Sequence, residues 1–289
     1  MEKAIEVQGL CKAFPGFALS DVSFDVPQGS IVGFIGENGA GKTTTIKCLL
    51  DVLRADSGSI SLLGQTDAAG RKEMHRDVGV VHDSCCFHDW LTTAGINTIM
   101  KNIFPAWDTS LYRQLLQQFG LEETSRKRKT IKAFSRGMKM KLSLAVAMAA
   151  RPKLLILDEA TSGLDPVVRD ELLDIFLEFI QEEDHSILFS SHITSDIEKA
   201  ADYLVFIHRG KIVLSGEKDE LLNRHRLVQG ARQSIASLPR EWVVGVRESS
   251  FGATALVNNP GVPLPSGNFQ TERATVDDIM LYTIRGEKQ

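Results

Sequence analysis

Short apolar segments at the start of the chain predict strands rather than helices. Residues 5–10 form the first segment, and residues 22–26 alternate apolar with polar side chains, which is the period of a strand buried on one face. The turn-forming residues 27–29 lead into a continuous apolar run, Ile31–Ile35, typical of a strand buried on both faces. The N-terminal part is therefore predicted to be β-rich and antiparallel, with a strand of a buried sheet behind it.

The middle of the chain, from about residue 85 to residue 150, changes to a helical period. One helix is predicted to end at Gly120. Its apolar face comprises Leu111, Leu115, Leu116 and Phe119. A second, largely buried helix is predicted over residues 137–150, with Ser135 as its N-cap and Pro152 just beyond its end. We interpret this stretch as an inserted helical lobe.

Strands and helices alternate after the lobe. Leu154–Leu157 predicts a buried strand, residues 168–179 an amphipathic helix and residues 187–190 another strand. Such a β-α-β order predicts a parallel sheet covered by helices. Residues 203–207 and 212–214 then predict a hairpin around a glycine-containing turn.

The last part of the chain, residues 226–289, is interpreted as a small α+β accessory region. It contains two predicted strands, 242–246 and 253–257, and a loop rich in proline and glycine at 260–267. A final short helix is predicted after a capping box that starts at Thr275. Nothing in this region indicates catalytic chemistry, and its function stays open.

Composition narrows the classes of function. The chain of 289 residues is 43% hydrophobic, enough for a sizeable core, and its net charge of −4 argues against nucleic acid as a partner. The basic run at 126–129 is interpreted as a solvated surface segment. The four cysteines lack C-x-x-C spacing, so we expect reduced thiols and neither a zinc site nor a disulfide framework. There is no signal-peptide core and no window of about 18 apolar residues, so a membrane role would require another chain.

The stretch Gly36–Thr44, GENGAGKTT, matches the phosphate-loop pattern G-x-x-x-x-G-K-[ST] at every fixed position. It lies between the strand predicted at 31–35 and a helix predicted over 43–53, where backbone N–H groups and the helix dipole meet at one point. The residues expected to hold the phosphates are Gly36, Asn38, Gly39, Ala40, Gly41, Lys42, Thr43 and Thr44. On its own, this loop fits a kinase, a GTPase, a helicase or a transporter motor equally well.

Three downstream segments narrow that choice. FSRGMKMKL (134–142) opens a predicted helix, LLILDEATSGLDP (154–166) carries two acids at the end of a buried strand, and SSH (190–192) follows the next strand. In this order, over residues 4–216, they resemble the ATP-binding subunit of ABC transporters. The resemblance implies an α/β fold with a P-loop NTPase (RecA-like) core, an N-terminal antiparallel β subdomain and a helical subdomain, all within residues 1–225.

The resemblance also implies a role for each residue at the ends of these strands. Asp158 is expected to bind Mg²⁺ together with Thr43, and Glu159 to polarise the attacking water. His192 is expected to reach the γ-phosphate of ATP beside Lys42. Glu159, His192 and Lys42 are therefore the predicted catalytic residues.

The helix start at 134–142 is expected to complete the nucleotide site of a second subunit. The resemblance assigns this role to Ser135 and Gly137, because a hydroxyl and helix N–H groups can converge on an anion. Taken alone, Ser135 would be interpreted first as a simple N-cap. The motif departs from the family pattern LSGGQ at Phe134, Arg136 and Met138, and we expect altered nucleotide contacts rather than an inactive site.

Two assignments keep alternatives open. Phe14 stands where the family places an aromatic ring against adenine, but Phe17 is a second candidate and core packing a rival role for Phe14. After the predicted strand 78–81 the family carries a glutamine that contacts Mg²⁺, whereas this chain has Asp83, whose carboxylate is shorter and charged. The following segment, 85–92, is expected to face the membrane subunit.

The prediction is an ATPase that acts as the motor subunit of an ABC-type exporter. MgATP would join two such subunits, identical or different, and hydrolysis would drive a separate polytopic membrane subunit at the inner face of the cell membrane. The motifs resemble those of bacterial bacitracin-resistance and small-peptide exporters, which implies a peptide or drug cargo. A soluble ABC ATPase for ribosomes or iron–sulfur assembly is the first alternative. A regulator that binds nucleotide without turnover is the second, and the intact Glu159 and His192 argue against it.

Overall fold

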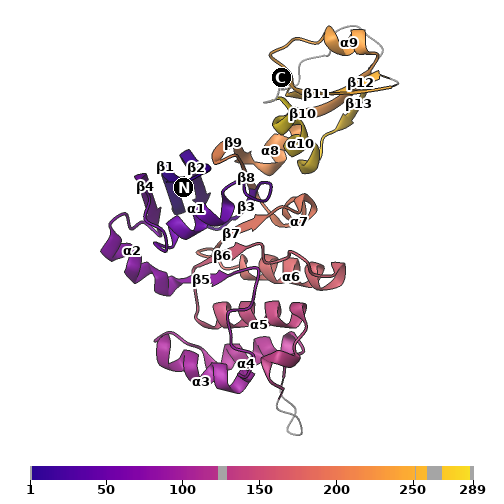
Figure 1. Ribbon diagram of the computed structural model, residues 1–289. Helices are drawn as coiled ribbons and strands as arrows, with labels where there is room; N and C mark the ends of the chain where they lie inside the picture. Colours follow the sequence, from indigo (N-terminus) through magenta and orange to yellow (C-terminus); the bar gives the residue numbers. More distant parts are fainter. Residues whose placement is uncertain (1, 123–128, 251, 259–268, 287–289) are drawn as a thin grey trace.

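The computed structural model describes residues 2–122, 129–250, 252–258 and 269–286 (Figure 1). The predicted loop at 260–267 and all but the last residue of the basic run at 126–129 lie outside these residues. Within them, every helix is too short or too polar to cross a membrane.

A six-stranded sheet forms the centre of the molecule, in the order β5-β6-β7-β3-β8-β9. Its strands are β3 (Ile31–Ile35), β5 (Val78–Val81), β6 (Leu154–Asp158), β7 (Ser186–Ser191), β8 (Tyr203–His208) and β9 (Lys211–Glu217). The first five strands in that order run parallel, and β9 pairs antiparallel with β8, which confirms the predicted hairpin. Its turn residues, Arg209 and Gly210, both have positive φ, 46° and 76°.

Both faces of this sheet are buried, as the continuous apolar runs predict. On β3, Ile31 and Ile35 belong to the core on the helical face, whereas Val32 and Phe34 belong to the core on the opposite face. A pair of aromatic rings packs in the core on each face of the sheet. The Phe34 ring stacks on Phe24 at 5.2 Å between centroids, and Phe176 meets Phe189 edge-on at 5.3 Å.

A three-stranded antiparallel sheet, ordered β2-β1-β4, covers the second of these faces. It consists of β1 (Lys3–Phe14), β2 (Phe17–Pro27) and β4 (Ser57–Leu62). Helix α1 (Lys42–Leu49) follows the phosphate loop and is shorter than the predicted 43–53. The prediction was too long because Asp51 takes a left-handed φ of 54°, which turns the chain out of the helix. A short helix α2 (Ala68–Met74) and a 3₁₀ turn, η1 (His75–Asp77), lead into β5.

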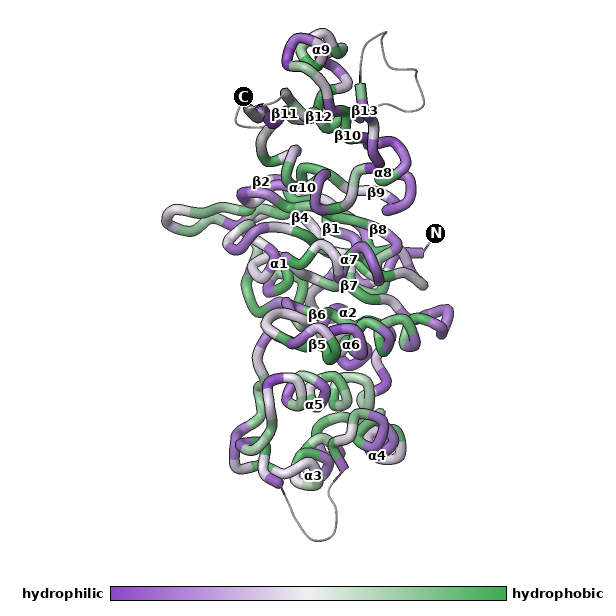
Figure 2. The backbone as a smooth tube through the Cα atoms, turned by 90° about the vertical axis from the view of Figure 1, so that its right-hand side faces the viewer, coloured by the Kyte–Doolittle hydropathy of each residue, from purple (hydrophilic) through white to green (hydrophobic). Residues whose placement is uncertain are grey.

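The other face carries helices, with α3 and α4 at the end of the molecule farthest from the C-terminal sheet (Figures 1 and 2). They are α3 (Thr93–Ile103), α4 (Thr109–Gln118), the 3₁₀ turn η2 (Ile131–Ala133), α5 (Arg136–Ala149), α6 (Pro166–Phe179) and α7 (Thr194–Ala200). Asp108, Ser135 and Asp165 cap α4, α5 and α6 with their side chains. As predicted, Gly120 lies just past the end of α4, with a φ of 67°.

The C-terminal part forms a four-stranded antiparallel sheet, ordered β11-β12-β10-β13. Its elements are α8 (Lys218–Arg224), β10 (His225–Gly230), α9 (Arg232–Ala236), β11 (Val243–Ser249), β12 (Gly252–Asn258), β13 (Gln270–Arg273) and α10 (Val276–Gly286). Thr275 and Asp278 form the predicted capping box, with Asp278 N donating to Thr275 Oγ1 at 3.2 Å. The sequence patterns found β11 and β12 but neither β10 nor β13. The four side chains of β13 are all exposed and polar.

Candidate active site

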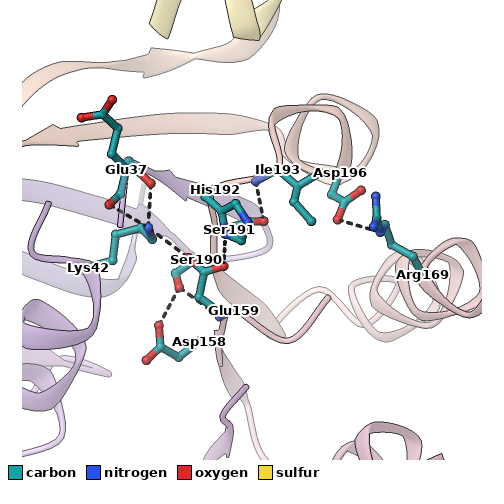
Figure 3. Close-up of polar contacts among 11 residues, drawn as sticks. Glu37, Lys42, Asp158, Glu159, Arg169, Ser190, Ser191, His192, Ile193 and Asp196 are labelled. Atoms are coloured by element: carbon teal, nitrogen blue, oxygen red, sulfur yellow. Dashed lines mark hydrogen bonds and ion pairs between the residues drawn. The ribbon is translucent and has the colours of Figure 1, made fainter. Parts of the chain in front are cut away.

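The carboxyl ends of three adjacent parallel strands meet at one edge of the central sheet. The phosphate loop follows β3, Asp158 ends β6, and His192 follows β7. Since neighbouring parallel strands end side by side, segments 36–42, 158–159 and 190–192 come together there (Figure 3).

The phosphate loop leads directly into α1. Gly39 and Gly41 have φ values of 82° and 120°, which only glycine adopts readily. A Cβ atom on Gly41 would also lie 2.6 Å from Leu19 Cδ2. Among the described residues, no side chain caps the start of α1 at Lys42, so its first-turn N–H groups are directed at the loop. A loop of this shape is suited to an anion.

Lys42 lies inside this loop. Its side chain is 5% exposed, and Nζ donates to the carbonyl oxygens of Gly36 at 2.6 Å and Glu37 at 3.3 Å. The same Nζ lies 3.0 Å from Glu159 Oε1, an ion pair that lacks the angle of a hydrogen bond. The Lys42 cation therefore lies between the phosphate loop and Glu159, the acid that follows β6, two strands away from β3 in the sheet.

Asp158 and Glu159 are held by one buried serine. Ser190 Oγ donates to Asp158 Oδ1 at 2.7 Å, while the Glu159 N–H donates to Ser190 Oγ at 3.2 Å and to the Ser190 carbonyl at 3.1 Å. Glu159 has a φ of 55°. A non-glycine residue in this left-handed region costs about 1–2 kcal/mol, and such strain gathers at functional sites.

Glu159 also contacts His192, the histidine predicted to reach the γ-phosphate. His192 Nδ1 lies 2.6 Å from Glu159 Oε2, so the carboxylate has Lys42 at one oxygen and His192 at the other (Figure 3). The His192 side chain is 39% exposed and Glu159 15%, so this cluster lies at the surface of the sheet edge. The three predicted catalytic residues are thus in mutual contact through Glu159.

Four other predicted site residues make no hydrogen bond or ion pair with this cluster among the described residues, and the elements that carry them give their places. Thr43 and Thr44 are in the first turn of α1, with Thr43 exposed. Asp83 follows β5 at the same sheet edge and is exposed. Phe14 is at the tip of the β1–β2 hairpin with its ring 40% exposed, whereas the Phe17 ring packs toward Gly41.

The helix start at 134–142, predicted to act on a second subunit, comes from a different layer. Ser135 Oγ accepts the N–H of Met138 at 3.2 Å, and Gly137 is buried against Val168. In the described part of the chain, no hydrogen bond or ion pair joins Ser135 or Gly137 to the phosphate loop. The Arg136 guanidinium lies over Gly163 of the loop that follows Glu159, where a Cβ atom would meet Nη1 at 2.7 Å.

Comparison with known proteins identifies the family. The family model described as "ABC transporter" matches residues 19–162. The bacitracin transport ATP-binding protein BcrA of Bacillus licheniformis is 35% identical over 209 residues, which cover 72% of this chain and 68% of the relative. The chain belongs to the ABC transporter ATP-binding family. Within this family, the lantibiotic transport ATP-binding protein SrtF of Streptococcus pyogenes is 33% identical over 235 residues, 79% of this chain and all of SrtF.

A solved structure supports the same assignment. The structure titled as the ATP binding subunit of an ABC transporter superposes with a TM-score of 0.67 at 30% identity, and covers 75% of this chain and 91% of its own. The predicted P-loop NTPase fold is confirmed. The ABC transporter ATP-binding subunit is an ATPase whose activity is coupled to transport, as its motifs predict.

Proposed function

We propose that this ABC protein is the motor subunit of an exporter for a peptide or drug, acting with a separate membrane subunit. The observation that carries the proposal is the contact of Glu159 with both Lys42 and His192, at 3.0 and 2.6 Å. The names of its relatives, bacitracin and lantibiotic transport proteins, support the class of cargo.

Each residue at the sheet edge has its own role in ATP hydrolysis. The uncapped N-terminus of α1 and the Lys42 cation bind the β- and γ-phosphates of ATP. In this proposal Glu159 accepts a proton from the attacking water, and His192, which contacts Glu159, donates to the γ-phosphate. Phe14 offers its exposed ring to adenine.

Asp158 and Thr43 fit a magnesium ion. Carboxylate and hydroxyl oxygens are the ligands Mg²⁺ prefers, and in the described residues Ser190 occupies only Oδ1 of Asp158, which leaves Oδ2 for the cation. When bound, the metal would neutralise charge on the phosphates. Asp83, at the same edge, is the further oxygen donor proposed for this metal.

Ser135 and Gly137 are proposed to act on the nucleotide of a second subunit. They open α5, a 14-residue helix whose N-terminus presents Ser135 at the surface. A hydroxyl together with a helix N-terminus favours a bound γ-phosphate, so ATP would hold two subunits together and hydrolysis would release them. The partner subunit is either a second copy or a related chain.

The helical lobe offers a surface for the membrane subunit. Trp90 is 70% exposed, Ile103 is 59% exposed and Ile99 38%. Large apolar side chains exposed close together along the chain are typical of protein contacts. We propose that the chain is bound to the inner face of the cell membrane through this surface.

Co-purification tests the proposal against a soluble ABC ATPase. Full-length tagged chain, extracted in detergent, should carry a polytopic membrane protein, and a Trp90→Ala variant should carry less of it. Recovery of ribosomes or iron–sulfur assembly proteins in its place would contradict the exporter role. Phosphate release from MgATP by the same complex distinguishes a motor from a regulator, which would show none.

A further inference from the structure

We propose that Asp196 is a positioning residue for ATP hydrolysis, which ties the helix after His192 to the loop after Glu159. The inference rests on the proposed roles of these two residues. Asp196 lies in α7, which begins two residues after His192. The loop that it reaches, residues 161–165, begins two residues after Glu159.

The link runs through Arg169 of α6. Arg169 Nε lies 3.7 Å from Asp196 Oδ2 (Figure 3). Arg169 Nη2 donates to the carbonyl oxygen of Leu164 at 3.2 Å. One guanidinium therefore contacts α7 on one side and the 161–165 loop on the other. A rigid planar donor with several N–H groups is suited to holding two such elements in register.

Thr161 of the same loop lies close enough to Asp196 to influence its ionisation. Thr161 is fully buried and Asp196 is 3% exposed. Burial raises the pKa of Asp196, while the Thr161 hydroxyl and the Arg169 charge favour its ionised form.

The free-energy cost of burying these polar groups argues against a purely structural role for Asp196. Thr161 Oγ1, Arg169 Nε and Asp196 Oδ2 are buried, and none has a partner at full hydrogen-bond geometry among the described residues. A buried carboxylate held by an ion pair gives a fold little stability compared with an apolar side chain of the same size. What this carboxylate provides is a fixed relation between α7 and the 161–165 loop.

The link through Asp196 affects the position of His192 relative to Glu159. His192 and Glu159 lie on the two elements that Asp196 joins, and their contact is 2.6 Å. A shift of either element changes the position of the groups that act on water and γ-phosphate. Misplacement of a catalytic group by about 1 Å can cost up to about 100-fold in rate, so loosening this link should lower turnover more than nucleotide binding.

The test is phosphate release from MgATP by the full-length chain, alone and with any co-purified membrane partner. Asp196→Asn keeps the shape and removes the charge, and kcat should fall about tenfold with KM for ATP within about twofold. Asp170→Asn is the matched control, because Asp170 also joins α6 to α7 through Lys199 but is exposed. This control should leave both constants unchanged.

A second variant keeps the test decisive. Arg169→Gln removes the other half of the link and should lower kcat to a similar extent, and the double variant should be no worse than either single one. An unchanged kcat in folded Asp196→Asn, a rise in KM alone, or multiplicative losses in the double variant would overturn the proposal. If the Asp196→Asn variant does not melt cooperatively, the test rests on Arg169→Gln. An unchanged kcat in Arg169→Gln is then sufficient to overturn the proposal.

Glu159→Gln and His192→Ala, measured in the same assay, separate this inference from the proposed function. Wild-type turnover in those two variants would refute the proposed catalytic roles. Lost turnover in them together with full turnover in Asp196→Asn would refute the positioning role alone.

Discussion

The adenine contact can be assigned to one of two rings by a single pair of substitutions. Phe14 is 40% exposed at the tip of a hairpin, so Phe14→Ala removes little buried surface and should barely change the melting temperature. Loss of stacking against a base is worth about 1–3 kcal/mol, which corresponds to a rise of about 5- to 150-fold in Kd for ATP. Phe14→Tyr, which keeps the aromatic face, should bind ATP like the wild type.

Phe17→Ala is the matched control for this prediction. The Phe17 ring packs toward Gly41 and belongs to the core beneath the N-terminal sheet, so its loss should lower the melting temperature by several degrees. Binding is measured by titration of each folded variant with a fluorescent ATP analogue labelled on the ribose. Unchanged affinity in Phe14→Ala, together with weak binding in folded Phe17→Ala, would refute the assignment and favour Phe17.

Two further predictions concern buried polar groups. Ser190→Ala leaves Asp158 Oδ1 without its partner, so we expect a loss of about 1–3 kcal/mol in the free energy of unfolding and a lower kcat, checked by urea titration and phosphate release. Equal stability and turnover would contradict this role. Burial lowers the pKa of His225 from its ordinary value of 6.5, so the unfolded chain binds a proton first and stability should fall as pH drops below about 6.5. His225→Gln should flatten that fall in melting temperature between about pH 7.5 and pH 5.5, and an unchanged slope would contradict the argument.

The sequence predicted those parts of the fold that local pattern controls. The continuous apolar runs of β3 and β6 reflect burial on both sheet faces, and the glycines of 36–41 reflect a backbone that other residues cannot follow. The end of α1 was missed because it depends on one left-handed residue, Asp51, which has no apolar pattern. Strand β13 was missed for a related reason, since its exposed polar side chains are set by pairing with β10 alone.

The same distinction applies to the site. The resemblance of the motifs predicted that Lys42, Glu159 and His192 act together, but did not show that one carboxylate contacts both Lys42 and His192. Ser190 is part of the predicted segment SSH, but only the pairing of β6 with β7 reveals that it holds Asp158. Asp196 is one of several polar residues in a seven-residue helix, and its partner comes from another helix. Contacts of this kind belong to tertiary packing and leave no periodic trace.

The most direct test of the whole account is phosphate release from MgATP by wild-type protein and by Glu159→Gln. This substitution keeps the size of the side chain and removes the carboxylate that joins Lys42 to His192. The account predicts that turnover falls by about 10²- to 10⁴-fold while ATP still binds, since a general base contributes that much to rate. Turnover equal to the wild type, with ATP bound normally, would contradict the central claim that Glu159 is the catalytic base of this ATPase.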